Sequence, residues 1–269
     1  MTSDRSAPFS PCRRIEGDPA SGIVLLCDHA CNGLPQEYGT LGLPAPEFDR
    51  HIAYDPGAEM MTERLAQRLG CPAVLSTFSR LLIDPNRGLD DPTLIMRLSD
   101  GAIIPGNHPM DADEVQHRID SYYAPYHALI ERTIEDAIQA GNPPMIFSIH
   151  TFTPVWKGQT RPWHGAILWD VDPRLARPMI EGLQAQEHLI IGDNEPYDGG
   201  LANDTLYRHA TSRGLADALV EVRQDLCSYE EGAHEWADRL AVLLERANAD
   251  PHLHVIKHYG SRCDGSAGA

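Results

Sequence analysis

Short apolar runs alternate with longer amphipathic segments along most of this sequence, and this alternation constrains the fold more than any other feature. The runs IVLLC (23–27), MIFSI (145–149) and ALVEV (218–222) have the length and composition of strands that are buried on both faces. Helical patterns lie between them, for example GAEMMTERLAQRLG at 57–70. This alternation predicts a three-layer α/β fold, in which helices cover both faces of a mainly parallel, mixed sheet.

The other expected elements follow from the same patterns. Strands are predicted at 73–77, 81–84, 166–169 and 188–191, and helices at 112–140 (bent or broken at Pro125), 173–186, 205–213 and 233–247.

A chain of 269 residues, 42% of them hydrophobic, has enough apolar material for one large core. We therefore expect a single domain over residues 21–259. Residues 1–20 are rich in proline, serine and charge, and residues 260–269 are small and polar, so both ends are predicted to be mobile tails.

Composition argues against several classes of function. Acidic residues outnumber basic ones by 39 to 22, a formal charge of −17, which disfavours a nucleic-acid partner. No apolar run reaches the roughly 20 residues of a membrane span, and the N-terminus lacks the apolar core of a signal peptide, so a cytoplasmic protein with no membrane partner is expected. The six cysteines form no disulfide or zinc pattern, and no nucleotide-binding glycine motif follows a strand.

Polar residues gather where the predicted strands end. IVLLC is followed by Asp28 and His29, MIFSI ends at His150, and ALVEV contains Glu221. Because the carboxyl ends of parallel strands meet at one edge of the sheet, these side chains are expected to lie together, at the place where α/β proteins bind their ligands.

A catalytic zinc ion takes three protein ligands, usually histidines and carboxylates, and leaves one position open. His29 and His150, with either Asp49 or His51, could supply that set. For Asp49, a helix-entry or loop hydrogen bond is an equal alternative, and for His51 the equal alternative is a partly buried ring. The segment FDRHIAYD brings Asp55 to the same edge as Asp49 and His51, and Asp55 precedes a proline, a pair that is typical of a helix N-cap.

Glu221 lies within an apolar strand, where burial raises a carboxyl pKa toward the range that a general base needs. An internal ion pair with Arg223 is the alternative. Strand alternation would also let Arg223 share the pocket of Glu221. Arg80 and Arg87 could each bind a substrate carboxylate, or could instead pair with Asp84.

Two loops rich in glycine, proline and aromatic residues are expected to flank the site. In the loop GDNEPYDGG (192–200), Asn194, Glu195 and Tyr197 could contact substrate, or could be turn residues. The other loop is TPVWKGQTRPWHG (153–165).

The ordered motifs DHACNGLP, DRHIAYDPGA, SRLLIDPNRG, PYH, SIHTFTPV, GDNEPY and VEVRQDL resemble the N-formylglutamate amidohydrolase family over residues 23–244. That family is similar in fold to zinc carboxypeptidases and to the aspartoacylase and succinylglutamate desuccinylase group. The resemblance implies a zinc-dependent amidohydrolase that cleaves the amide bond of a small N-acyl amino acid.

The resemblance also implies roles for individual residues. One zinc ion would be held by His29, Asp49 and His150, with Asp49 chosen because Asn32 stands where the relatives carry a glutamate. Glu221 would be the catalytic carboxylate. Asn86 and Arg87 match the pair that binds the substrate carboxylate in the carboxypeptidase-like relatives. The positions of Arg80, Arg223 and Asn194 in the sequence add these three as further candidates for substrate binding, with Arg80 or Arg223 available for a second carboxylate or an oxyanion. A carboxypeptidase-type peptidase and a non-catalytic binding protein remain alternatives, and the oligomeric state is left open.

Overall fold

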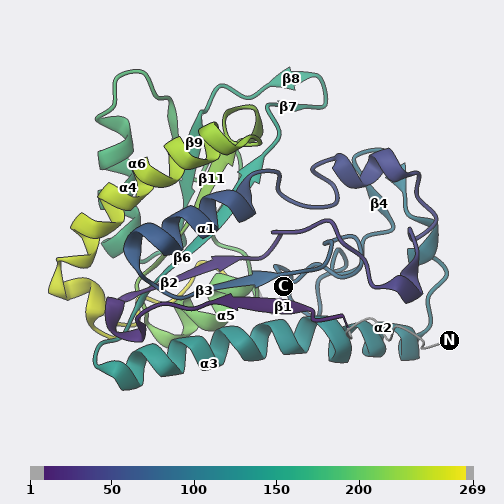
Figure 1. Cartoon of the computed structure of the whole chain (residues 1–269), viewed down its shortest axis with the longest axis horizontal. Coiled ribbons are helices and arrows are strands. Elements are labelled where there is room, and N and C mark those ends of the chain that lie inside the picture. The colour runs from purple at the N-terminus through teal and green to yellow at the C-terminus, as the bar shows by residue number, and fades with distance from the viewer. Residues whose placement is uncertain (1–8, 265–269) are drawn as a thin grey trace, which may run out of the picture.

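The fold is built on one mixed sheet. A computed structural model of the protein describes residues 9–264, and within them seven strands pair in the order β1-β3-β2-β6-β11-β9-β10 (Figure 1). β1 is antiparallel to β3 and β11 is antiparallel to β9, whereas the other pairs are parallel. The strands are β1 (Cys12–Ile15), β2 (Ile23–Cys27), β3 (Ala73–Ser76), β6 (Met145–Phe152), β9 (Gly165–Leu168), β10 (Ile191–Asp193) and β11 (Asp217–Arg223).

Helices cover both faces of the sheet. The apolar sides of α1 (Ala58–Leu69), α4 (Pro173–Gln184) and α6 (Glu230–Asn248) pack on one face and form the larger apolar cluster. On the other face lie α3 (Ala124–Ala140) and the short α5 (Thr205–His209), as Figure 1 shows. This arrangement confirms the predicted α/β class with helices on both sides of a mainly parallel, mixed sheet.

Smaller elements complete the fold around the sheet. Helix α2 runs through a π-helical turn, η5, into α3, so the predicted long helix is interrupted just before Pro125, which sits in the first turn of α3. The remaining elements are α2 (Ala112–Arg118), η5 (Ile119–Tyr123), the hairpins β4 (Leu98–Ser99) with β5 (Ala102–Ile103) and β7 (Val155–Trp156) with β8 (Gln159–Thr160), and the 3-10 helices η1 (Pro19–Ser21), η2 (Gln36–Tyr38), η3 (Ala45–Asp49), η4 (Pro105–Asn107), η6 (Thr211–Arg213), η7 (Gln224–Leu226) and η8 (Pro251–His254).

The structure corrects parts of the predicted tails. Residues 12–15 form β1, which pairs with β3 along its whole length. Near the other end, Arg262 donates to the Asp170 carboxylate at 3.0 Å and to the Trp169 carbonyl at 2.6 Å. These backbone and charge contacts hold segments whose composition alone indicated mobility. Residues 1–8 and 265–269 of the predicted tails lie outside the described part of the chain.

The segment 81–84 is not the predicted strand. Its backbone instead bonds to loops, with Leu82 N donating to Ser79 O and Asp84 N donating to Leu94 O. The apolar side chains are buried in clusters formed by the surrounding loops and η5. The apolar run at 81–84 therefore predicted correctly that these residues are buried, but it did not predict correctly that they pair in a sheet.

None of the helices within residues 9–264 combines the length and apolarity that crossing a bilayer requires.

Candidate metal and active site

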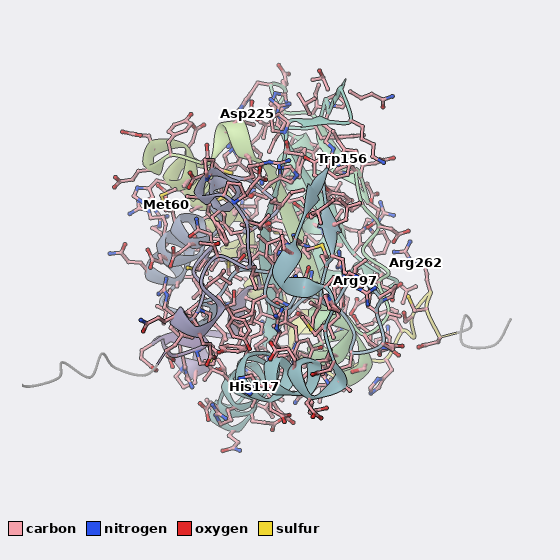
Figure 2. The ribbon with its side chains drawn as sticks, turned by 90° about the vertical axis from the view of Figure 1, so that its right-hand side faces the viewer. Met60, Arg97, His117, Trp156, Asp225 and Arg262 are labelled. Carbon is pink, nitrogen blue, oxygen red and sulfur yellow. The ribbon has the colours of Figure 1, made fainter. Side chains whose placement is uncertain are left out.

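A cavity of about 370 Å³ lies at the end of the central strands. It is lined by β6, β9 and β11, by the loops that follow β2 and β3, and by residues of the β4 and β7 hairpins. Trp156 of β7 and Arg97 lie on the side of the molecule that faces the viewer in Figure 2. The position at strand ends is the one that the sequence predicted for a ligand site.

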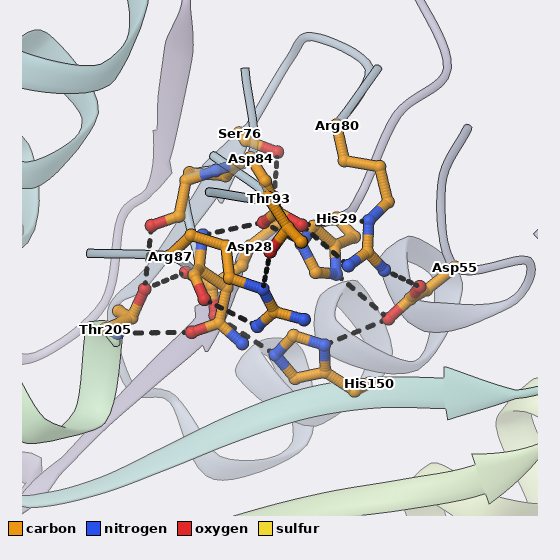
Figure 3. A network of polar contacts seen from close by, with 12 residues as sticks. Asp28, His29, Asp55, Ser76, Arg80, Asp84, Arg87, Thr93, His150 and Thr205 are labelled. Carbon is orange, nitrogen blue, oxygen red and sulfur yellow. Dashed lines mark hydrogen bonds and ion pairs between the residues drawn. The ribbon is translucent and has the colours of Figure 1, made fainter. Parts of the chain in front are cut away.

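Three buried side chains converge in this cavity and form what we call the histidine cluster: His29, Asp55 and His150. One potential ligand atom from each lies within 4.8 Å of the others. Oδ2 of Asp55 is 3.4 Å from Nδ1 of His29 and 3.0 Å from Nδ1 of His150 (Figure 3). Both rings therefore present the same nitrogen to one carboxylate oxygen.

The opposite nitrogen of each ring is held by a second buried carboxylate. Nε2 of His29 lies 2.7 Å from Asp84 Oδ1, and Nε2 of His150 lies 3.1 Å from Asp28 Oδ2. Donation from Nε2 leaves Nδ1 as the atom with a free lone pair, and Nδ1 of His29 is buried without a hydrogen-bond partner. A carboxylate behind each histidine is the arrangement that orients imidazoles for metal binding.

The sequence places these side chains through strand register and one tight turn. In adjacent parallel strands, His150 of β6 stands beside Glu221 of β11. Asp55 comes from the turn before α1, where its backbone N–H donates to His29 O. The turn requires Gly57, with φ +93°, because a Cβ there would lie 2.2 Å from the Cys227 carbonyl oxygen.

The electrostatics of the cluster favour a cation. Burial would raise the pKa of Asp28, but the hydrogen bond and charge of His150 lower it to about 2. Burial likewise opposes ionisation of Asp55 and Asp84, yet the charges of His29 and Arg80 hold both carboxyl pKa values below their usual range. Ionised carboxylates thus surround the two rings.

The pKa of His150 reflects the same ionised carboxylates. Burial lowers it, but the hydrogen bonds to Asp28 and Asp55 outweigh burial and raise it to about 10. The cluster therefore stabilises positive charge at its centre, and two imidazoles with one carboxylate are the donor set of a catalytic divalent metal. These residues fit a metal ion.

Glu221 occupies the same cavity but has a different environment. Its carboxyl is buried and lines the cavity, and one oxygen, Oε2, has no hydrogen-bond partner among residues 9–264. Burial raises the pKa of Glu221 to about 8, and the charges of His150 and Arg80 only partly offset this effect. Such a carboxyl can both accept and return a proton near neutral pH.

Three of the predicted substrate-binding residues line the cavity: Arg80, Asn86 and Arg87. Arg80 is committed to carboxylates, at 2.6 Å from Asp84 and 3.7 Å from Asp55. Arg87 donates to Thr93 Oγ1 and to the Asn86 carbonyl, and among the described residues its guanidinium forms no ion pair. Arg87 is therefore the lining cation that is available to bind an anionic ligand.

Other predicted site residues lie elsewhere. Arg223 does not line the cavity, because at the strand end its side chain turns to Asp225 and to the carbonyl oxygens of Arg161 and Trp163. Asn194, at φ +55°, accepts hydrogen bonds from the backbone of Trp169 and Gly199 and is a turn residue.

Asp49 is the predicted ligand that the structure does not bring to the two histidines. It is exposed at the end of η3, and Asp55 occupies the third position of the cluster. We therefore replace Asp49 by Asp55 in the candidate ligand set. His51 lines the cavity but stands 3.5 Å from Asp100 and against Trp156, outside the cluster.

Sequence reasoning also missed the supporting roles of Asp28 and Asp84. Each acid directly follows or ends a buried apolar run, the same signal that pointed to His29 and His150. Asp55 was placed at the same edge and interpreted as a helix N-cap, but it was not chosen as a ligand. In the structure the N-cap of α1 is Gly57, and the helix begins at Ala58.

The chain is similar to known proteins in sequence and in fold. The family model described as N-formylglutamate amidohydrolase matches residues 21–228. The crystal structure of gene product Atu2144 from Agrobacterium tumefaciens is 33% identical, with a TM-score of 0.83 over 89% of this chain and 95% of that one. N-formylglutamate amidohydrolase from Ralstonia eutropha JMP134, 22% identical, has a similar fold, with a TM-score of 0.70 over 89% of this chain and 97% of that one.

Among curated proteins, the comparison finds no match to this chain. The predicted family resemblance is confirmed by the family model, whereas the further likeness to zinc carboxypeptidases stays a prediction.

Proposed function

Since the chain belongs to the N-formylglutamate amidohydrolase family, we propose that it hydrolyses the amide bond of an N-acyl amino acid with the help of one zinc ion. The observation that carries the proposal is the histidine cluster, which presents two Nδ1 atoms and one carboxylate beside an unpaired, buried Glu221.

His29, Asp55 and His150 would hold the metal. When bound, it supplies Lewis acid chemistry, which polarises the amide carbonyl and makes water more acidic. Zinc is the proposed ion because two imidazoles with one carboxylate are ligands that it commonly takes in hydrolases. Asp84 and Asp28 keep the rings in the tautomer that directs Nδ1 into the cavity.

Glu221 would move the proton. Its carboxylate takes a proton from the attacking water and returns it to the nitrogen of the departing amine, so that the same group acts first as base and then as acid. The position beside His150 in the strand register keeps this carboxylate at the cluster, and the missing hydrogen-bond partner leaves an oxygen free for the proton.

Arg87 would bind the α-carboxylate of the substrate through a charge-assisted hydrogen bond. Asn86 stands beside it, and its Oδ1 accepts from Thr205 N, which leaves the amide NH₂ to donate to the same carboxylate. Arg80 would hold Asp55 and Asp84 in place.

The proposal is tested by two measurements on protein purified without chelators. Elemental mass spectrometry is expected to find close to one zinc per chain, and amine release is expected from N-formyl amino acids. A His150→Ala variant should lose both the zinc and the activity. A folded, metal-free protein that cannot be reloaded, or a metalloprotein that cleaves dipeptides but no N-acyl amino acid, would contradict the proposal.

A further inference from the structure

One part of the cavity lining is apolar, and we call it the leucine wall: Leu168, Leu206 and Leu219. All three line the cavity and belong to one apolar cluster on this face of the sheet. Leu219 of β11 stands beside Leu168 of β9 in the antiparallel register, and Leu206 comes from α5. The wall is therefore fixed by regular elements.

The position of this wall relates it to the reacting bond. Leu219 precedes Glu221 by two residues, so both side chains point to the same side of β11. At its other end, the wall continues through Leu206 to Thr205, whose backbone N–H donates to Asn86 Oδ1 at 3.1 Å. The wall thus spans from the proton carrier to the residues that would bind the α-carboxylate.

That interval is where the side chain of an amino acid must lie. In an N-acyl amino acid, the side chain branches from the carbon between the carboxylate and the amide nitrogen. With the carboxylate at Arg87 and the amide at Glu221, the side chain faces the leucine wall.

The charges around the wall give a second, independent reason to expect an uncharged substrate side chain there. The cavity has two lining arginines, of which Arg80 is paired with acids and Arg87 is used by the α-carboxylate. Arg161 does not line the cavity, and its guanidinium lies over the rings of Tyr197 and Phe152. No lining cation within the described residues is left for a second carboxylate.

An acid also stands beside the wall. Asp204 lines the cavity next to Leu206 and is buried, with its carboxylate accepting from Tyr207 N as the cap of α5. Burial raises the pKa of Asp204 to about 7, and the charge of Arg87 offsets this only in part. A further carboxylate placed here would lose its hydration without gaining a cation as partner among the described residues.

From the leucine wall and the lack of a free cation, we infer that this chain prefers N-acyl amino acids with an uncharged, apolar side chain over N-formylglutamate. The inference rests on the proposed function for its substrate class. The inference concerns the side chain of the substrate, whereas the proposed function concerns the reaction.

The test compares three substrates with the same formyl group. N-formyl-leucine offers an apolar side chain, N-formylglutamate a charged one, and N-formylglutamine the uncharged shape of glutamate. For the zinc-loaded protein, kcat/KM for N-formyl-leucine is expected to exceed that for N-formylglutamate by at least about tenfold, with N-formylglutamine between them. Equal values, or a preference for N-formylglutamate, would overturn the inference and leave the proposed function standing.

A binding measurement separates the inference from the proposed function. Calorimetric titration of the zinc-loaded Glu221→Gln protein with the same compounds reports affinity without turnover. If no compound is hydrolysed by the wild-type protein, the proposed function fails, but tighter binding of N-formyl-leucine still supports the apolar subsite. Tighter binding of N-formylglutamate, or binding of none of the three, overturns it.

Substitution within the wall gives the converse result. Leu206→Arg, at the first turn of α5, places a cation on the wall and is expected to shift the kcat/KM ratio toward N-formylglutamate by about tenfold. Leu219→Lys is the second variant should the first fail to fold. Ile190→Arg adds the same charge at an exposed position outside the cavity and should leave the ratio unchanged. An unchanged ratio in both folded wall variants would contradict the subsite.

Discussion

The histidine cluster and the region around Glu221, beside the leucine wall, line the same cavity, but their polar side-chain atoms differ in how far they are hydrogen-bonded. In the cluster, each imidazole is backed by a carboxylate, and Arg80 bridges Asp55 and Asp84. Beside the wall, one oxygen of the Glu221 carboxyl has no hydrogen-bond partner in the described part of the chain. One region is organised before any ligand arrives, and the other keeps a polar group unsatisfied.

The difference follows from what each region has to do. Ligands of a metal ion must be held in fixed directions, which hydrogen-bonded carboxylates provide. A proton carrier must exchange its proton, which is easiest when burial has moved its pKa near neutrality and no internal partner competes. The following variants test whether these two regions have these separate roles.

Loss of the unpaired carboxyl has the largest expected effect. Glu221→Gln keeps the shape of the side chain but cannot take up a proton, so kcat should fall by roughly 10²- to 10⁴-fold while bound zinc is retained. Amine release and elemental analysis on the same preparation check both parts. The exposed Glu187→Gln is the matched control. A Glu221→Gln protein with full activity would remove this residue from the proposed chemistry.

The next effect concerns the cation between the two regions. Arg87→Met removes the proposed contact with the α-carboxylate. KM should rise by about 100-fold, because this is the effect expected when a pair of charge-assisted hydrogen bonds to the substrate is lost. Steady-state kinetics with one N-formyl amino acid measure it. Arg177→Met, on an exposed arginine paired with Asp193, controls for loss of charge. An unchanged KM would mean that the carboxylate binds elsewhere.

A smaller effect is expected behind the histidine cluster. Asp84→Asn offers an NH₂ group to His29 Nε2 and favours the tautomer with the proton on Nδ1, so zinc affinity should fall by about tenfold. Competition with a zinc-binding dye measures the affinity. Asp238→Asn breaks an arginine-paired acid on α6 as the control. If the two variants bind zinc equally, Asp84 does not orient His29.

Much of this arrangement was predictable because it depends on local pattern. The apolar runs at 23–27, 145–149 and 218–222 are the three central strands that deliver His29, His150 and Glu221 to one edge. Period-two alternation and the geometry of parallel sheets suffice for these three residues.

The remaining members depend on tertiary contacts that a local pattern does not contain. Asp55 precedes a proline as a capping residue does, and only the packing of Gly57 against the Cys227 carbonyl sets the turn that sends its side chain to the histidines. Strand alternation predicts that Arg223 points to the same side as Glu221. The strand ends at Arg223, however, and its side chain instead donates to the Asp225 carboxylate. Asp49 belongs to the right loop, yet η3 leaves it exposed.

The smallest expected effect is on stability, and it tests whether the buried, unpaired carboxyl of Glu221 lowers the free energy of unfolding. Its pKa is raised from 4.5 to about 8, so between these values the folded chain binds more protons than the unfolded one. The free energy of unfolding therefore falls as pH rises through this window. After removal of metal by chelation, Glu221→Gln should melt several degrees above the wild type at pH 8 and higher, and the difference should shrink toward pH 4.5. Differential scanning fluorimetry across this range measures it, with Glu187→Gln as control. A difference in melting temperature that is the same at every pH would point to packing and not to charge, and the contrast between the two regions of the cavity would then lose its electrostatic basis.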